Sequence, residues 1–118
     1  MPDFPDDLLP VLQSAWSAET SPQWLPGNPA KGQCNVIALV VHDFFGGETL
    51  KTETSSGWHY YNRVAGAHVD LTASQFASPI HYADVASDRT EALAGTSPDR
   101  YGRLRAQVGV GLKARQRP

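Results

Sequence analysis

The first apolar residues of the chain are spaced as on one face of a helix. They recur at intervals of three and four residues, and they are Leu8, Leu9, Val11, Leu12, Ala15 and Trp16. This spacing predicts an amphipathic helix over residues 6–17, in which Pro10 is tolerated only near the first turn. Residues 19–33 contain three prolines and two glycines, so we expect a loop there.

The longest apolar segment comes next and predicts a buried helix. Residues 36–41 are apolar throughout, and the segment that contains them runs from Gln33 to Phe45 before Gly46 and Gly47. Its β-branched residues also suit a strand, but its length favours a helix. Gly46 is placed to end that helix in a left-handed turn. Cys34 therefore falls in the first turn of a central helix.

Three shorter segments predict an antiparallel sheet. Residues 48–53 are typical of a half-buried strand, and the aromatic-rich residues 58–64 are typical of a second strand. Residues 68–71 predict a short third strand, which pairs antiparallel with the second across the tight connection 65–67. Thr72 and Gln75 then have the spacing of a capping box, which predicts one helical turn.

The last third of the chain gives a mixed pattern. Residues 77–96 show no regular spacing and are expected to be irregular. Ser97 followed by Pro98 suits the start of a helix, so we predict a helix over 98–108. The apolar residues also alternate near the end of the chain, and two glycines there disfavour a helix, so the structure of 109–118 stays open.

These elements predict an α+β fold in a single domain that spans residues 1–118. The length of 118 residues suits one domain, and a hydrophobic content of 41% excludes disorder for most of the chain. We expect the central helix that carries Cys34 to pack on a small antiparallel sheet, with further helices at both termini.

Charge and cysteine content narrow the partners and the compartment. The formal net charge of −2 gives no basic field for nucleic acid, and no apolar run approaches the roughly 20 residues of a membrane span. The first 20 residues carry four acids and no base, unlike a secretory signal. Because a single cysteine cannot form an internal disulfide, we expect a cytoplasmic protein.

Six of the ten basic residues lie in the last 19 positions of the chain. This concentration admits two interpretations, a solvated helix face or a small patch for an anion or a nucleic acid. Its arginines are not interleaved with aromatic residues, since only Tyr101 is nearby. The solvated face is therefore the favoured interpretation, and no nucleic-acid partner is expected.

The candidate chemistry centres on one cysteine. A cysteine nucleophile needs a thiolate, which a helix N-terminus and a nearby imidazole favour. A carboxylate then orients the imidazole, and amide donors stabilise the oxyanion. Cys34 fits the nucleophile, His59 the base, Asp70 the orienting carboxylate, and Gln33 with the Cys34 backbone amide the oxyanion donors. This set predicts acyl transfer or amide hydrolysis on a small-molecule or peptide substrate, without a cofactor.

Contact between His59 and Asp70 depends on the register of the hairpin. Closing the hairpin near Gly66 places His59 opposite position 73 and Asp70 opposite position 62. A bulge or a longer turn shifts this pairing by about one or two residues. Both arrangements stay open at this point.

Other interpretations of the same residues also stay open. A cysteine in an apolar helix is often a small core residue, and His59 among aromatic residues suits a buried structural histidine. His68, close before Asp70, is a rival base. Cys34, His59, His68 and Asp70 are all zinc-ligand types, but they lack the paired spacing of zinc sites, so no metal is expected.

A second class of function does not involve catalysis. Trp58, Tyr60 and Tyr61 are residue types that line binding grooves, although they are equally common in cores. They suit a module that binds a small ligand or a protein. An inactive member of an enzyme fold is a third interpretation.

Four blocks of sequence resemble the YunG-like family of small bacterial proteins. They are Asn28–Cys34, Gly46–Glu48, His59–Arg63 and Val69–Phe76, and the resemblance extends over roughly residues 14–105. It implies a family without implying a reaction.

The order of the candidate triad is similar to that in transglutaminase-like and arylamine-acetyltransferase-like members of the papain-like group. In those proteins a cysteine on a helix precedes a histidine on a strand and an aspartate on the next strand, and His59–Asn62 and Asp70–Thr72 fit their patterns. The resemblance implies a papain-like minimal core with Cys34 as nucleophile. The chain departs from the group in its short separation of 25 residues between Cys34 and His59 and in lacking a tryptophan beside the cysteine.

Overall fold

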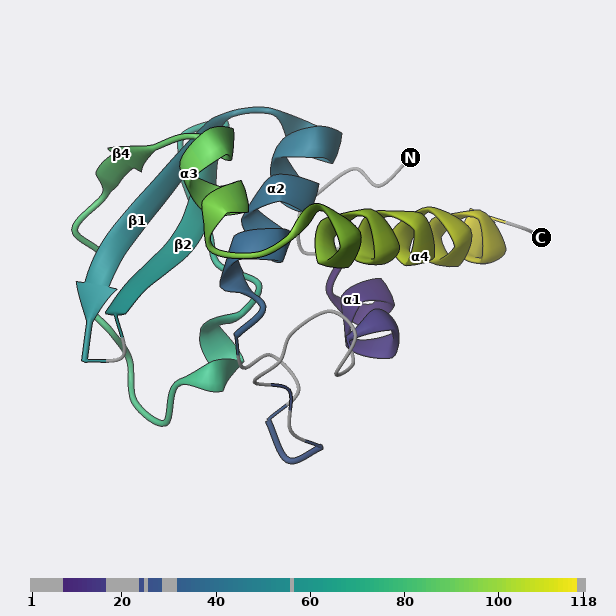
Figure 1. The fold of residues 1–118 in the computed structure, drawn as a ribbon, viewed down its shortest axis with the longest axis horizontal. Coiled ribbons are helices and arrows are strands. Elements are labelled where there is room, and N and C mark those ends of the chain that lie inside the picture. The colour runs from purple at the N-terminus through teal and green to yellow at the C-terminus, as the bar shows by residue number, and fades with distance from the viewer. Residues whose placement is uncertain (1–7, 17–23, 25, 29–31, 56, 117–118) are drawn as a thin grey trace.

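An antiparallel sheet forms one layer of the molecule, and helices cover it. The structure is a computed structural model that describes residues 8–16, 24, 26–28, 32–55 and 57–116, with side chains as far as residue 112. In this part of the chain the sheet has four strands in the order β3-β2-β1-β4 (Figure 1). The strands are β1 (Glu48–Thr54), β2 (Gly57–Val64), β3 (Ala67–Val69) and β4 (Val85–Ser87).

The helices lie together beside the sheet. They are α1 (Leu9–Ala15), α2 (Cys34–Phe45), α3 (Arg89–Ala94) and α4 (Pro98–Gln116), with a short 3-10 turn η2 (Ala73–Gln75). Helix α2 packs against β2 on one side and against α3 and α4 on the other, while α4 extends away from the sheet (Figure 1). The predicted α+β class, with a central helix that carries Cys34, is confirmed.

Helix α2 forms where the apolar segment predicts it. Six consecutive residues from Val36 to Val41 are buried, so this helix is apolar on nearly every side. It ends at Gly46, which has a positive φ of 68° and whose backbone N–H donates to the His42 carbonyl. A positive φ is easily reached by glycine, so this residue stops the helix at low cost.

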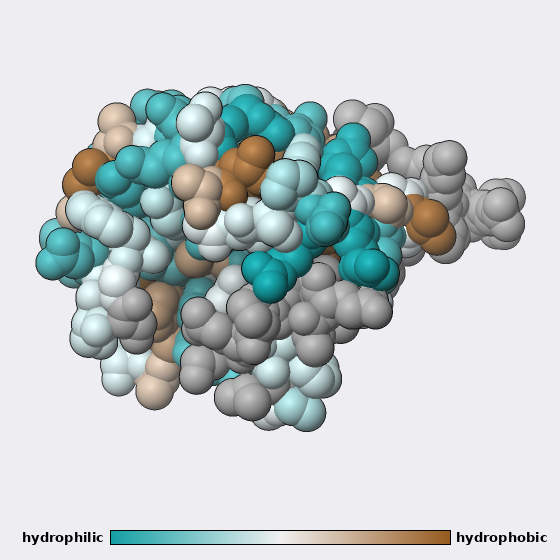
Figure 2. Space-filling model, in the orientation of Figure 1, coloured by the Kyte–Doolittle hydropathy of each residue, from teal (hydrophilic) through white to brown (hydrophobic). Residues whose placement is uncertain are grey.

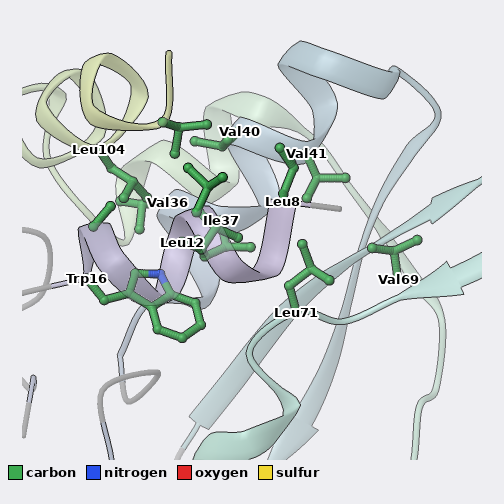
Figure 3. Packing of buried hydrophobic residues seen from close by; sticks show 13 residues of the cluster. Leu8, Leu12, Trp16, Val36, Ile37, Val40, Val41, Val69, Leu71 and Leu104 are labelled. Carbon is green, nitrogen blue, oxygen red and sulfur yellow. The ribbon is translucent and has the colours of Figure 1, made fainter. Parts of the chain in front are cut away.

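The main core lies between the helices and one end of the sheet. Side chains from α1, α2, α4 and β3 meet there in a single cluster (Figure 3). Its buried members include Leu8, Leu12, Val36, Ile37, Val40, Val41, Val69, Leu71, Leu104 and Val108. The cluster fixes α2 against the other helices, and the N-terminus of α2 is thereby held at a defined place beside β2.

Where the structure describes them, the predicted elements before residue 76 are confirmed with small changes; most of the expected loop 19–33 and both ends of the predicted helix 6–17 lie outside the described residues. Helix α1 has Pro10 in its first turn, as expected, and the predicted strands 48–53 and 58–64 correspond to β1 and β2. The predicted strand 68–71 is shorter, because Asp70 and Leu71 leave the ladder after β3. The helical turn after Thr72 is present as η2, but the capping box is wrong, since no side chain caps that turn.

Two elements lie where an irregular segment was expected, so the expectation for 77–96 is corrected. Strand β4 has three residues and pairs with β1, and α3 has six residues. Helix α3 begins with Asp88, whose carboxylate accepts a hydrogen bond from the Glu91 backbone N–H at 2.8 Å. Elements this short have too few residues for an apolar period to appear.

The terminal segment 109–118, left open from the sequence, is helical as far as Gln116 within α4. Ser97 accepts a hydrogen bond from the Arg100 backbone N–H at 3.1 Å, which caps the start as predicted. Gly111 fits because a Cβ there would lie 2.6 Å from a methyl group of Val11. The glycine thus lets α4 approach α1 closely, and this packing offsets its poor helix propensity.

The register of the hairpin formed by β2 and β3 differs by one residue from the register that places Asp70 opposite residue 62. Ala65 and Gly66, with φ of 52° and 82°, form a two-residue turn. Val64 therefore pairs with Ala67, and Asn62 pairs with Val69. Positive φ at both central positions is the signature of the type I′ turn that suits twisted hairpins. Because side chains alternate along strands, this shift moves Asp70 onto the face that carries His59.

The face of the molecule seen in Figure 2 is mostly hydrophilic, with hydrophobic residues in small separate groups. Among the described residues, the large hydrophobic side chains that stay exposed are Trp58, Val85 and Val110. No described helix combines the length and the apolar character needed to cross a membrane.

Candidate active site

A buried histidine and a buried carboxylate are hydrogen-bonded at the end of β2. The Nε2 atom of His59 lies 2.7 Å from Oδ2 of Asp70, and the two side chains are only 2% and 8% exposed. Asp70 follows β3 directly, so the hairpin register brings it to the His59 face. The contact that the sequence left open is therefore present.

Asp70 is held as a carboxylate by several donors. Its Oδ1 accepts hydrogen bonds from the backbone N–H of Thr72 at 3.2 Å and from the Thr72 hydroxyl at 3.1 Å. Its Oδ2 accepts a further bond from the Tyr82 hydroxyl at 2.7 Å. Burial raises the pKa of Asp70, but the hydrogen bond from His59 and these donors outweigh burial and lower that pKa below its usual value.

The imidazole of His59 is in its positively charged, doubly protonated form at neutral pH. Burial lowers the pKa of His59, but the hydrogen bond to Asp70 and the influence of Cys34 raise it to about 9. The ring stacks beside Tyr61 with centroids 6.1 Å apart and meets the edge of Phe76 at 4.8 Å. These contacts fix the plane of the ring. Because Asp70 only accepts hydrogen bonds, Nε2 carries a hydrogen and Nδ1 is the ring nitrogen left for another partner.

Cys34 stands in the first turn of α2 and is 8% exposed. Its Sγ lies 3.4 Å from Oδ1 of Asn35, which accepts the thiol hydrogen. The Asn35 amide in turn donates to the Ala92 carbonyl of α3 at 3.0 Å. A Cβ at Gly95 would collide with that amide, so the glycine leaves room for it. Helix α3 therefore fixes the side chain next to the thiol.

Gln75 ties the loop before α2 to the segment that carries Asp70. Its side-chain oxygen accepts from the Gly32 backbone N–H at 3.4 Å, and its carbonyl accepts from the Asn28 amide at 3.0 Å. The start of α2 is thereby attached to η2, three residues beyond Thr72. This attachment holds Cys34 in place beside the His59 and Asp70 pair.

The side-chain amide of Gln33 is buried and has no hydrogen-bond partner among the described residues. Gln33 immediately precedes α2 and is 0% exposed, and among the described residues neither its Nε2 nor its Oε1 has a hydrogen-bond partner. An amide that is buried without a bond costs about 1–3 kcal/mol. Gln33 directly precedes Cys34 in the chain, so its Nε2 stays a candidate donor to an oxygen bound near the sulfur.

Comparison with known proteins identifies the family. The family model described as YunG protein matches residues 5–113. This chain belongs to the YunG family. It is 41% identical over 95 residues to "Uncharacterized protein YunG" of Bacillus subtilis (strain 168), an overlap of 80% of this chain and 83% of the relative. The resemblance to the YunG-like family is confirmed. No solved structure matches the chain, and the papain-like resemblance stays a prediction.

In this YunG-family protein, the three aromatic residues predicted to line a groove do not share one surface. Tyr60 and Tyr61 are adjacent in β2, so they point to opposite faces of the sheet, and both are buried. Tyr60 packs beside Cys34, whereas the Tyr61 hydroxyl donates to Asp84 at 2.7 Å. Trp58 is 47% exposed, with the ammonium of Lys51 lying 4.4 Å from its ring centroid.

The rival base His68 has a carboxylate partner of its own. Its Nε2 lies 2.8 Å from Oδ1 of Asp84, and its side chain is 51% exposed. Arg63 also contacts that carboxylate, at 3.0 Å. In the YunG-family structure His68 is thus turned toward Asp84, away from the pair that includes His59. Within the described residues, no three histidine, cysteine, aspartate or glutamate side chains are grouped so as to hold a metal ion.

Three residues of the site were not singled out from the sequence. Thr72 was assigned to a helix cap, but its hydroxyl and backbone N–H both bind Asp70. The spacing of Asp70 and Thr72 is that of a local Asx-type turn, which was a usable signal. Tyr82 contacts Asp70, and Asn35 contacts Ala92. Both partners are distant in the sequence, so no local pattern marks either residue.

Proposed function

We propose that this protein is a cysteine-dependent enzyme that transfers acyl groups or hydrolyses amides, with Cys34 as nucleophile, His59 as proton carrier and Asp70 as orienting carboxylate. One observation carries the proposal. The imidazole of His59 is hydrogen-bonded at 2.7 Å to the buried carboxylate of Asp70, and the Cys34 thiol at the start of α2 helps to raise the pKa of that imidazole.

The electrostatics of the pair support this role. Asp70 accepts the Nε2 hydrogen, so the Nδ1 atom of His59 is the nitrogen available to the thiol of Cys34. With a pKa of about 9, His59 is an imidazolium at neutral pH. A positive imidazolium and the N-terminal end of a helix both favour a thiolate next to them. Such an ion pair is the reactive state of cysteine hydrolases and transferases.

The proposed reaction has two halves. The Cys34 thiolate attacks the carbonyl carbon and forms a tetrahedral oxyanion; the bond to the leaving group then breaks, and the His59 imidazolium gives that group its proton. The product is a thioester on Cys34. Water or an amine then attacks the thioester while neutral His59 takes a proton from it. Collapse of the second oxyanion expels the thiolate, which restores the ion pair.

The oxyanion has two candidate donors that are adjacent in the sequence. They are the backbone N–H of Cys34 and the Nε2 of Gln33, as the sequence predicts. The free and buried amide of Gln33 supports the assignment, because a donor that lacks a partner in the resting protein gains one in the tetrahedral intermediate. Loss of such a donor costs roughly 10²–10³ in rate in enzymes of this type.

Alkylation of Cys34 by iodoacetamide tests the proposal, because the chain has a single cysteine. At a pH of about 6 an ordinary thiol with a pKa near 8.5 is less than about 1% ionised. We expect the native protein to react at that pH at least about tenfold faster than the His59→Gln variant. Cys34→Ser serves as the control for labelling elsewhere and should keep the fold.

Two results would contradict the proposal. The first is a thiol that reacts only after the protein is denatured, which would make Cys34 a core residue. The second is an equal rate at low pH in the native protein and the His59→Gln variant, which would mean that the imidazole does not activate the thiol. Circular dichroism of each variant shows whether a slow rate reflects lost chemistry or lost structure.

A further inference from the structure

An apolar pocket adjoins the His59 and Asp70 pair. Its volume is about 360 Å³, and the residues that line it lie in η2 and in the segment between η2 and β4. They are Ala73, Phe76, Ala77, Ser78, Pro79, Ile80 and Tyr82. Two of them also belong to the candidate site, since Phe76 meets the His59 ring at 4.8 Å and Tyr82 donates to Asp70 at 2.7 Å.

The lining determines which chemical groups the pocket accepts. None of its residues is charged, so an ion placed there would lose its hydration without gaining a counter-charge. The Tyr82 hydroxyl is already bound to Asp70, and its ring contributes an apolar wall. Most of the remaining wall is methyl, methylene and ring carbon. An uncharged apolar group therefore fits this lining, and a charged group does not.

We propose that this pocket binds an apolar group of the substrate, a short alkyl chain or an apolar side chain carried by the acyl or amine part. The proposal rests on the assigned role of Cys34 and adds the class of substrate. The volume lies at the small end of ligand pockets, which suits one side group and excludes a large polymer segment within the pocket itself.

Binding there affects the catalytic pair directly. An apolar group that fills the pocket covers Phe76 and the ring of Tyr82 and removes water from the side of the pair that they border. Less water strengthens the hydrogen bond between His59 and Asp70, because the local dielectric falls. Recognition of the apolar group and orientation of the imidazole are therefore coupled through two shared side chains.

Alkylation with paired reagents tests the substrate class. N-hexyl iodoacetamide carries an apolar chain, N-(5-carboxypentyl) iodoacetamide carries a charged chain of similar length, and iodoacetamide carries none. We expect the hexyl reagent to react with Cys34 at least about tenfold faster than the carboxylated one. Ile80→Asp should abolish this preference, measured as the ratio of the hexyl rate to the carboxylated rate within the same variant. Val110→Asp, which adds the same charge to an exposed position on α4, is the matched control.

The outcomes separate the two proposals. If iodoacetamide labelling depends on His59 but the hexyl and carboxylated reagents react equally, the triad stands and the pocket proposal is wrong. If labelling does not depend on His59, the proposed function fails, and the pocket is then judged by binding alone. Hexanamide added to Cys34→Ser should shift the NMR signals of the Phe76 and Tyr82 rings. Absence of that shift, or an equal shift in Ile80→Asp, would overturn the pocket proposal.

Discussion

The buried pair of His59 and Asp70 makes the stability of this protein depend on pH. In the unfolded chain a histidine has a pKa near 6.5, whereas the folded protein raises the pKa of His59 to about 9. The folded state therefore binds this proton more tightly. The stabilisation is fully present below a pH of about 6.5 and is lost as the pH rises through about 9.

The size of this effect follows from the two pKa values. Each tenfold change in proton affinity corresponds to about 1.4 kcal/mol, so a pKa raised from 6.5 to about 9 corresponds to about 3 kcal/mol. The lowered pKa of Asp70 results in part from the same hydrogen bond with His59. Its contribution is present above the usual pKa of aspartate and is lost as the pH falls. A contribution of about 3 kcal/mol is a large part of the roughly 5–15 kcal/mol of net unfolding free energy that a domain has.

The substitution Asp70→Asn removes the charge that raises the pKa of His59. Burial, which lowers that pKa, is then no longer opposed by the main interaction that raises it. In the parent, the unfolding free energy falls between a pH of about 6 and a pH of about 9. We expect most of this fall to be absent in the Asp70→Asn variant. Urea unfolding at both pH values measures this change. Cys34→Ser serves as the common background, because the cysteine of the unfolded chain otherwise ionises in the same range.

A matched control exists in the second histidine and aspartate pair. Asp84→Asn makes the same change beside His68, whose side chain is half exposed. Solvent screens that pair, so the pH dependence of stability should stay close to that of the parent. An NMR titration that gives His59 a pKa near 6.5 in the folded parent would refute the reasoning. So would an Asp70→Asn variant that loses as much stability between the two pH values as its parent does.

Three further substitutions test other parts of the structure. Leu104→Ala removes a fully buried core side chain and should lower the unfolding free energy by about 2–5 kcal/mol in denaturant titrations; a change under about 1 kcal/mol would contradict the core assignment. Asn62→Ala removes the 3.1 Å hydrogen bond to the Ala38 carbonyl, which keeps its backbone partner within α2, and should cost about 0.5–1.5 kcal/mol in the same assay; an unchanged unfolding free energy would contradict this role. Gly95→Ala displaces the Asn35 amide and should slow iodoacetamide labelling of the neighbouring thiol with little change in melting temperature; an unchanged labelling rate would argue against that positioning role.

The sequence predicts the parts of the fold that depend on long apolar patterns. Helix α2 is marked by an apolar run that is too long for a typical strand and that ends at Gly46, and the structure places its boundaries at Cys34 and Phe45. By contrast, α3 depends on Asp88 as its cap and on packing against α2. A six-residue helix that is stabilised by its neighbours leaves almost no periodic signal in its own residues.

The sequence predicts which residues form the candidate site, but it does not predict how they contact one another. The types and order of Cys34, His59 and Asp70 suggest the chemistry, but their contact depends on the turn at Ala65 and Gly66. Alanine rarely adopts the positive φ that this turn requires, so its side chain gives no signal for a type I′ turn. The supporting bond from Asn35 joins residues 57 positions apart, and only the folded chain reveals it.

The two-residue turn between β2 and β3 also limits how this protein can change in length. Val69 is buried in the core and Asp70 bonds His59 from the opposite face of the same short segment. Inserting or deleting one residue in the turn would exchange those faces, which would expose the valine and turn the carboxylate toward the core. Stability and the proposed chemistry would then be lost in one step. In this exposed turn, substitutions that keep the positive φ at both positions are therefore better tolerated than gaps.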